Sequence, residues 1–372
     1  MGSIFSSESY NPEEHGQSSR ALFDEYLASD DKFQDLSSKV VAITGTSSQS
    51  IGFHIAEIAI RKKAKVLLLC NRDSSSSQKG TQDLQALAKE CSSPTSIQAV
   101  TCDLQDLASV RQAADKINDI CKTHQGLDVL VCNAGVMALK DIRTNDGYDV
   151  QMQTNQLSHF CLTAGVWKSI VQAANTRGEA RVVTHSSSAR AHPNANLEKE
   201  YFFKCDPGTL GGDSYPTMLQ MMGWRGHWMR YHMTKLANAN FAMALHDKIQ
   251  ATPALKGKIQ ASSADPGLAT SNLQATTIKD GGMPSWLAKL LGGNGQSPAD
   301  GSLPVGLAAF GAATKSGSFF QPAQSLKGPP IATVEEGVPV KKGGEPLVVS
   351  PQNKENVWNW CEEGLDMKFV LE

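Results

Sequence analysis

The sequence predicts an α/β domain built on a doubly wound parallel sheet. From Lys39 onward, short runs rich in Val, Ile and Leu alternate with longer segments of helical period, which is typical of parallel strands joined by helices. The runs are apolar at successive residues rather than at every second one, as expected for strands buried on both sides. We therefore expect helices on both faces of the sheet.

The predicted elements follow in a regular order. Strands are expected over residues 40–44, 66–70, 97–102, 127–132, 180–185 and 258–263. Helices are expected over residues 51–62, 78–90, 107–123, 150–174, 229–250 and 355–365. Stretches rich in Gly, Pro and other turn formers predict loops or lids over residues 193–228, 281–304 and 322–346.

The length of 372 residues exceeds the roughly 250–300 residues over which one hydrophobic core usually grows. The choice lies between one enlarged domain and two small ones. The surplus is scattered around one alternating pattern, so we expect a single domain over residues 38–372. A polar, flexible extension over residues 1–37 precedes this domain. The domain itself carries an insert over residues 193–228, a lid over 276–304 and a tail over 319–372.

The composition excludes several classes of protein. Hydrophobic residues make up 40% of the chain, and 35 basic residues balance 37 acidic ones, which excludes a disordered protein and a nucleic-acid binder. No apolar run approaches the roughly 20 residues of a membrane-spanning helix. The 8 cysteines form no Cys-x-x-Cys pair, which predicts reduced thiols in a cytoplasmic protein without a metal site. Among them, Cys70, Cys102 and Cys132 are expected to be small buried hydrophobic residues.

The first six residues carry a possible targeting signal. Met1-Gly2-Ser3-Ile4-Phe5-Ser6 fits the pattern for N-myristoylation of Gly2. A single acyl chain gives only marginal, reversible membrane binding. Two alternatives stay open: a cytoplasmic protein, or one that also visits a membrane peripherally through Gly2.

A turn punctuated by glycine follows the first predicted strand. Such a turn lets backbone N–H groups and the start of a helix face a pyrophosphate. Ser50 stands where a middle glycine is expected, and one residue is inserted, so an ordinary Ser/Gly turn is the alternative. The predicted cofactor contacts in this turn are Gly45, Ser47, Ser50, Ile51 and Gly52.

The end of the second strand bears on the choice of cofactor. An arginine near this position holds a 2′-phosphate, whereas an acidic residue binds a free ribose hydroxyl. Arg72 therefore favours NADP, and the adjacent Asp73 keeps NAD as the alternative.

Polar residues also end the third and fourth strands. Asp103-Leu104 and Asn133-Ala134-Gly135 lie where the carboxyl ends of central strands border the ligand crevice of open α/β sheets. We expect these residues to contact the cofactor. The alternatives are that Asp103 caps the next helix and that Asn133 closes a turn.

The residues for chemistry lie near the fifth strand and the long helix after the insert. Tyr231 and Lys235 are one helical turn apart on one face, and a lysine ammonium or an oxidised nicotinamide lowers the pKa of a phenol. Ser186, Ser187 and Ser188 end the fifth strand, where a serine hydroxyl can hydrogen-bond a substrate oxygen. Asn155 is placed to hold a water that passes protons from Lys235. Strand alternation points His185 away from Ser187, so we expect a core or supporting role for it.

This order of motifs resembles the short-chain dehydrogenase/reductase family over about residues 39–270. The segments 155–160, 181–183 and 234–238 resemble its retinol dehydrogenase and protochlorophyllide oxidoreductase-like branch more narrowly. The motifs that carry the family resemblance are Thr44-Gly45…Gly52, Asp103, Asn133-Ala134-Gly135, Asn155, Ser187, Tyr231…Lys235 and Pro266-Gly267.

The resemblance implies a Rossmann-type domain with a defined set of catalytic residues. Tyr231 would be the general acid/base. Ser187 best matches the serine that stabilises the substrate oxygen, with Ser186 and Ser188 as flanking alternatives. Lys235 would bind the nicotinamide ribose and lower the pKa of Tyr231, with Asn155 in the proton relay. Pro266-Gly267 would form the loop beside the nicotinamide.

The insert and the lid predict a lipophilic or aromatic small-molecule substrate, because adaptable Met and rigid aromatic side chains suit an apolar pocket. Packing of these side chains into the body of the protein is the alternative. The leading expectation is an NADP-dependent carbonyl reductase or alcohol dehydrogenase. Its rivals are a light-dependent double-bond reductase and a cofactor-binding regulator without turnover. Oligomeric state stays open. The side chains concerned are Tyr201, Phe202, Phe203, Met218, Met221, Met222, Trp224, His227 and Trp228 in the insert, and Trp286, Leu287, Leu290 and Leu291 in the lid.

Overall fold

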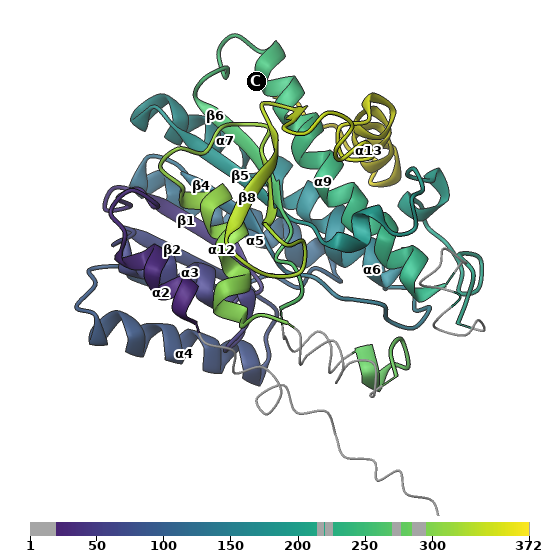
Figure 1. The fold of residues 1–372 in the computed structure, drawn as a ribbon, viewed down its shortest axis with the longest axis horizontal. Coiled ribbons are helices and arrows are strands. Elements are labelled where there is room, and N and C mark those ends of the chain that lie inside the picture. Colours follow the sequence, from purple (N-terminus) through teal and green to yellow (C-terminus); the bar gives the residue numbers. More distant parts are fainter. Residues whose placement is uncertain (1–19, 214–218, 220–225, 270–276, 285–294, 372) are drawn as a thin grey trace, which may run out of the picture.

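One sheet of nine strands forms the centre of the computed structural model (Figure 1), in the order β3-β2-β1-β4-β5-β6-β7-β8-β9. The structure describes residues 20–213, 219, 226–269, 277–284 and 295–371. Neighbouring strands from β3 to β7 run parallel, and β8 and β9 continue the sheet antiparallel. The predicted doubly wound parallel sheet is confirmed.

The predicted strands and helices lie within a few residues of the observed ones up to Ala264. The strands are β1 (Val40–Thr44), β2 (Val66–Asn71), β3 (Ser96–Thr101), β4 (Val129–Cys132), β5 (Ala180–His185) and β6 (Ile259–Ala264). The helices are α3 (Ile51–Arg61), α4 (Ser75–Glu90), α5 (Leu107–His124), α6 (Val150–Met152), α7 (Ser158–Arg177) and α9 (His227–Ala251). Short helical turns lie at η1 (Gln153–Leu157), η2 (Ser188–Ala191) and η3 (Lys199–Phe202).

Successive residues of the central strands enter two separate cores. Val40 and Ala42 of β1 pack with α5, α7 and α9 on one face, whereas Val41 and Ile43 pack with α3 and α12 (Pro298–Phe310) on the other. All five residues of β1 are buried. Burial on both sides explains why this strand is apolar at every position rather than alternating.

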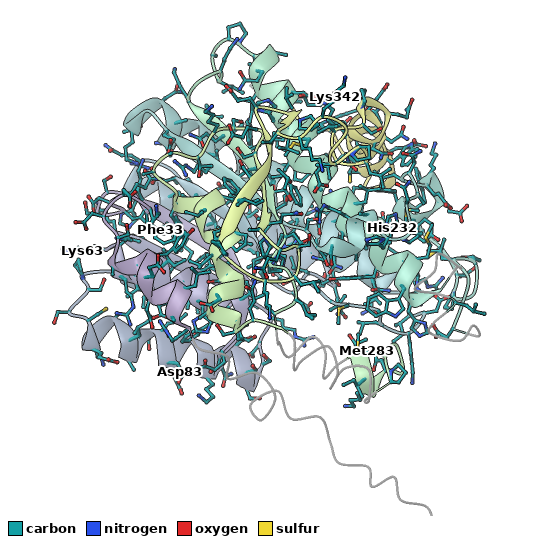
Figure 2. The ribbon with its side chains drawn as sticks, in the orientation of Figure 1. Phe33, Lys63, Asp83, His232, Met283 and Lys342 are labelled. Atoms are coloured by element: carbon teal, nitrogen blue, oxygen red, sulfur yellow. The ribbon has the colours of Figure 1, made fainter. Side chains whose placement is uncertain are left out.

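The chain before β1 is folded from residue 20, so the expectation of a flexible extension over residues 1–37 is wrong for residues 20–37. Helix α2 (Ala21–Ala28) buries Phe23, whose backbone N–H donates to Asp300 Oδ1 of α12 at 2.9 Å. Arg20 donates to the buried Glu57 at 2.8 Å. Phe33, labelled in Figure 2, is also buried. The myristoylation pattern at Met1–Ser6 lies outside the described residues.

The chain after β6 adds strands and helices where loops were expected. Helix α12 replaces part of the predicted loop 281–304, and Ser297 caps it by accepting from Asp300 N at 3.0 Å. Strand β7 (Phe319–Pro322) ends where the predicted loop 322–346 begins, and strands β8 (Pro330–Glu335) and β9 (Val338–Pro339) lie within that predicted loop. Helix α13 (Pro351–Gly364) packs beside α9 (Figure 1). The tail is therefore part of the sheet and core of one domain, and not a peripheral addition to that domain.

Two further expectations bear on the class of protein. No helix within the described ranges is long and apolar enough to cross a membrane. All eight cysteines are unpaired, and Cys70, Cys102 and Cys132 are buried as predicted.

Candidate active site

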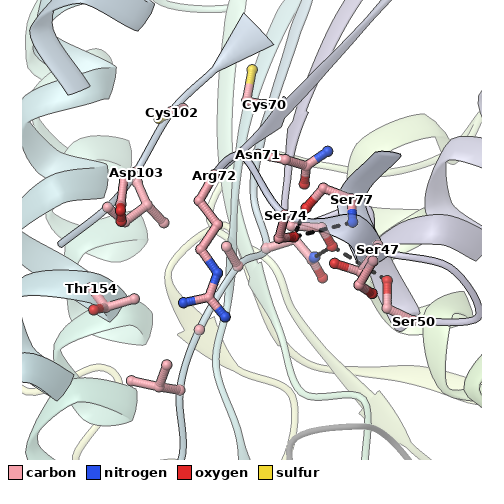
Figure 3. Close-up of a pocket in the computed structure, with 18 of the residues that line it drawn as sticks. Ser47, Ser50, Cys70, Asn71, Arg72, Ser74, Ser77, Cys102, Asp103 and Thr154 are labelled. Atoms are coloured by element: carbon pink, nitrogen blue, oxygen red, sulfur yellow. Dashed lines mark hydrogen bonds between the residues drawn. The ribbon is translucent and has the colours of Figure 1, made fainter. Parts of the chain in front are cut away.

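A cavity opens at the carboxyl ends of the central strands (Figure 3). The predicted cofactor residues that line it are Gly45, Ser47, Ser50, Ile51, Gly52, Arg72, Asp103, Leu104, Asn133, Ala134 and Gly135. The sequence-based prediction missed Cys70, Asn71, Ser74, Ser76, Ser77, Cys102, Gln105, Val136, Met137 and Thr154, and did not place His185 in the lining.

The turn after β1 brings backbone, rather than side chains, to the cavity. Gly45 has φ of +76°, and a Cβ on Gly52 would lie 2.2 Å from Gly45 O. Both positions therefore require glycine. Ser50, which stands where a middle glycine was expected, caps α3 by accepting from Phe53 N at 3.1 Å. The altered turn keeps a backbone cradle at the positive end of a helix, which fits a pyrophosphate.

Asn71 fixes the other side of this turn. Its Oδ1 accepts from Thr46 N at 2.8 Å, and its Nδ2 donates to Thr46 Oγ1 at 2.8 Å. Because Asn71 ends β2, this pair ties the turn to the neighbouring strand. In the sequence, the position of Asn71 next to Arg72 at the end of a predicted strand was the one feature that could have indicated that Asn71 holds this turn.

Arg72 and a second helix start meet at the end of the cavity near β2. The Arg72 side chain points into the cavity in Figure 3. Ser74 caps α4 by accepting from Ser77 N at 3.2 Å, and both serines line the cavity. The positive end of α4 and the guanidinium together suit an anion. Asp73 is outside the lining and accepts instead from Gln78 Nε2 at 3.0 Å.

Asn133 joins three strands at the floor of the cavity. Its Nδ2 donates to Thr44 O at 2.9 Å and to Gly45 O at 3.1 Å. Its Oδ1 lies 2.9 Å from Nδ1 of His185, and burial lowers the pKa of His185 well below its usual value. A neutral His185 therefore supports Asn133, in line with the supporting role expected for it.

Tyr231, Ser187 and Lys235 come together beside this floor. Tyr231 is buried, and a hydrogen bond with Ser187 acts to lower the pKa of its phenol. Lys235 Nζ lies 5.8 Å from the centre of the Tyr231 ring and donates to His185 O at 2.9 Å. These contacts bring together α9 and the carboxyl end of β5, as the sequence predicts.

The pKa values of this group differ from the expectation. Burial raises the pKa of Tyr231 above its ordinary value and lowers that of Lys235 to about 7. The phenolate and the ammonium are both charged, so removing water disfavours each of them. In the protein alone, desolvation of the Tyr231 phenol outweighs its hydrogen bond with Ser187, so the pKa of Tyr231 is raised. The expected lowering of this pKa by Lys235 is therefore not observed.

The three consecutive serines separate into different environments. Ser186 is fully buried, and its hydroxyl donates to Lys235 O at 2.7 Å. Ser188 begins η2. Of the three, Ser187 is the serine that hydrogen-bonds Tyr231, and its role toward a substrate oxygen stays a prediction.

Asn155 lies in the π-helical turn η1 and holds the loop after β4. Its Oδ1 accepts from Val136 N at 2.8 Å, while its Nδ2 donates to Val136 O at 2.9 Å and to Thr234 Oγ1 at 3.0 Å. Its own carbonyl accepts from Asn238 Nδ2 at 2.7 Å. The amide therefore positions the cavity wall, and the expected hold on a water passing protons from Lys235 stays a prediction.

Several predicted site residues lie outside the cavity lining. These are Asn155, Ser187, Tyr231, Lys235, Pro266 and Gly267. Lys235 adjoins the cavity, since a Cβ on Gly135 would lie 3.5 Å from Lys235 Nζ. Gly267 has φ of +69°, and its N–H donates to Asp265 Oδ1 at 2.8 Å, which sets the turn of this loop.

The aromatic residues of the insert occupy two different environments. Tyr201 and Phe202 are fully buried in the core, so for them packing is the correct alternative. Trp228 is half-buried, its ring centre lies 5.9 Å from that of Tyr231, and its Nε1 donates to Gly282 O at 2.9 Å. Met218, Met221, Met222, Trp224, Trp286, Leu287, Leu290 and Leu291 lie outside the described residues.

Comparison with known proteins identifies the family. Residues 39–199 match the family model described as short chain dehydrogenase. The chain is 27% identical over 351 residues to short-chain dehydrogenase/reductase prx1 of Penicillium rubens, covering 92% of this chain and 89% of that protein. Over residues 39–199 the chain belongs to the short-chain dehydrogenase/reductase family. It is accordingly an NAD(P)-dependent oxidoreductase.

Other relatives agree with this membership. The chain is 30% identical over 218 residues to the human WW domain-containing oxidoreductase, covering 58% of this chain and 46% of that protein. An uncharacterised protein from Mycobacterium paratuberculosis shares the fold with a TM-score of 0.62 at 24% identity, covering 91% of this chain and 97% of that one.

Proposed function

We propose that this short-chain dehydrogenase/reductase uses NADPH to reduce a carbonyl group on a lipophilic or aromatic small molecule. The observation that carries the proposal is the meeting of Tyr231, Ser187 and Lys235 beside a cavity whose far end holds Arg72. The same residues support the reverse reaction, alcohol oxidation with NADP⁺. Membership of the retinol dehydrogenase-like branch is part of the proposal.

The protein's own groups supply the proton and orient the substrate. NADPH, when bound, supplies a hydride to the carbonyl carbon. Ser187 donates a hydrogen bond to the substrate oxygen, and Tyr231 Oη transfers its proton to that oxygen as negative charge develops. The raised Tyr231 pKa keeps the phenol protonated at neutral pH, which suits a general acid. Lys235 binds the nicotinamide ribose and, when protonated, favours the phenolate that is left.

The cavity residues fit the two ends of NADPH. The glycine turn and α3 suit the pyrophosphate, and Arg72 with the start of α4 suits the 2′-phosphate. Asp103 and Leu104 would contact the adenine part of the cofactor, and the loop of Pro266 and Gly267 would contact its nicotinamide part. NAD with Asp73 as the ribose ligand is the alternative.

Trp228 supports a flat, apolar substrate. It stands edge-on to Tyr231 and is joined to the lid by its hydrogen bond to Gly282. An aromatic ring in this position contributes a large apolar surface with little conformational freedom. A substrate carbonyl held against Tyr231 would therefore pack its apolar part on Trp228.

The unpaired cysteines support a cytoplasmic location, since disulfides are rare in reducing compartments. A peripheral membrane visit through a myristoylated Gly2 is the finer proposal. Mass spectrometry of the native N-terminus tests it, and an unmodified Gly2 or a retained Met1 would remove it.

Substitution of the phenol tests the proposed chemistry. In Tyr231→Phe, turnover of NADPH with a panel of aldehydes, ketones and quinones should fall about 10²- to 10⁴-fold, the usual contribution of proton transfer. NADPH binding, followed by cofactor fluorescence, should change little. Turnover near that of the wild type would refute the role of Tyr231. Activity only in light would favour double-bond reduction, and binding of NADPH without any turnover would favour a regulator.

A further inference from the structure

Arg190 joins the serine loop to the end of the chain from a buried position. It lies in η2, three residues after Ser187, and is only 4% exposed. Its guanidinium stacks over the Phe319 ring of β7 at 4.2 Å. An arginine buried this deeply needs a partner for each of its N–H groups.

All five N–H donors of Arg190 are used. Nε donates to Glu345 Oε2 at 3.0 Å, and Nη2 donates to Glu345 Oε1 at 2.5 Å and to Gln321 Oε1 at 2.6 Å. Nη1 donates to Asp265 Oδ2 at 2.7 Å and to Ser187 O at 3.1 Å. A lysine offers three donors around one point, so it cannot replace this planar fork.

The partner on one side is part of the loop beside the nicotinamide. Asp265 is 1% exposed, and its other carboxylate oxygen accepts from Gly267 N at 2.8 Å. One guanidinium group therefore fixes both the backbone of Ser187 and the carboxylate that shapes the Pro266-Gly267 turn.

The partners on the other side come from the tail. Gln321 belongs to β7, and Glu345 lies between β9 and α13. Glu345 makes a bidentate pair with Arg190, the strongest geometry available to an arginine and a carboxylate. The tail thus holds the guanidinium from the side opposite to the catalytic loop.

We propose that Arg190 is a positioning residue for Ser187, and that Glu345 of the tail sets the position of Arg190. This inference rests on the proposed function, since it assumes that Ser187 and Tyr231 act on the substrate. Glu345 touches neither of these side chains, so its effect on turnover passes through Arg190 and the serine loop.

Glu345→Gln tests the proposal, with Glu179→Gln as a matched control. Glu179 also pairs with a buried arginine, Arg181, at 2.9 Å, but near the opposite end of β5. With NADPH and phenanthrenequinone as probes, Glu345→Gln should lower kcat on the order of 10- to 100-fold, the usual cost of a small misplacement of a reacting group. The KM for NADPH should change less than twofold, and Glu179→Gln should keep the wild-type kcat.

A double-mutant cycle separates positioning from general destabilisation. If Glu345 acts through Ser187, then Glu345→Gln should lower kcat less than about twofold in a Ser187→Ala background. Equal losses of kcat in both backgrounds would overturn the proposal. A wild-type kcat in Glu345→Gln would overturn it as well.

Titration of Tyr231 in the NADP⁺ complex gives a readout that needs no substrate. Within the part of the chain that the structure describes, the charged groups facing Tyr231 are Lys235 on α9 and Asp265 after β6. The tyrosinate absorbance, taken as a difference from Tyr231→Phe, should show a raised pKa in both Ser187→Ala and Glu345→Gln. Removal of the Glu345 charge alone would lower this pKa, so a downward shift or no shift would contradict the proposal. Full turnover in Ser187→Ala and Tyr231→Phe would instead overturn the proposed function.

Discussion

The preference for NADPH over NADH should depend on Arg72. Arg72→Ala removes the one lining side chain that places a full positive charge at the β2 end of the cavity, among the residues that the structure describes. A hydrogen bond to a charged group contributes about 1.5–3 kcal/mol. Arg72 is exposed, so screening by water and salt favours the lower figure. The expected loss of NADPH affinity is therefore about tenfold.

The assay compares kcat/KM for NADPH and NADH in three variants. Arg72→Ala should lower kcat/KM for NADPH about tenfold and leave that for NADH unchanged. Arg111→Ala, an exposed arginine on α5 outside the cavity lining, serves as the control and should alter neither. Asp73→Ala should also alter neither, because Asp73 bonds Gln78 instead of facing the cavity.

Two outcomes would refute this reasoning. An NADPH-to-NADH ratio that stays within twofold of the wild type in Arg72→Ala would show that the guanidinium does not bind the 2′-phosphate. A loss of NADH activity confined to Asp73→Ala would favour the NAD alternative. The loss in Arg72→Ala should also shrink as salt rises, since the contact is exposed.

Two further predictions concern stability. Contacts with His54 and Arg20 hold the pKa of the buried Glu57 at about 2, below its ordinary value of 4.5. The contribution of Glu57 to the stability of the fold is therefore complete above pH 4.5 and is lost as the pH falls towards 2. Glu57→Gln should lower the free energy of unfolding in urea by about 2–3 kcal/mol at pH 7, and a difference that does not shrink at low pH would contradict this. Phe160→Ala should lower the free energy of unfolding by about 3–5 kcal/mol, since Phe160 is fully buried against Phe241 and Trp358. Urea titration measures this loss. A loss below about 1 kcal/mol would show that the core relaxes around the space left by the ring.

The first two thirds of the fold could be predicted because its strands are buried on both faces. A run such as 40–44, followed by a glycine turn and a helical segment, carries its own periodicity and its own start signal. The lining residues that were predicted follow those strands directly, so they were predictable for the same reason. Asn133 and Arg72 are examples.

The end of the chain gave weaker signals. Strand β7 has four residues and ends in Pro322, and β9 has two, so neither shows a period. Helix α12 starts with Ser297-Pro298, an ordinary helix start, but Pro304 inside it indicates a loop. The pattern of a single segment also cannot show which distant elements cover it.

Contacts between distant segments explain the remaining misses at the site. Arg190 pairs with Glu345, which lies 155 residues further along the chain, and no local pattern connects the two. The raised pKa of Tyr231 has the same origin. Its desolvation depends on the three-dimensional surroundings, whereas the sequence shows only the neighbouring Lys235.

The antiparallel strands after β7 also determine how this sheet meets other chains. Without them, β7 would offer a row of unpaired backbone groups on which a second sheet could grow. Strand β9 offers only two residues, one of which is Pro339, and Lys341 and Lys342 follow it closely. A short strand, a proline and charged side chains are the features that discourage strand addition, so this edge resists aggregation although Val338 and Val340 are exposed.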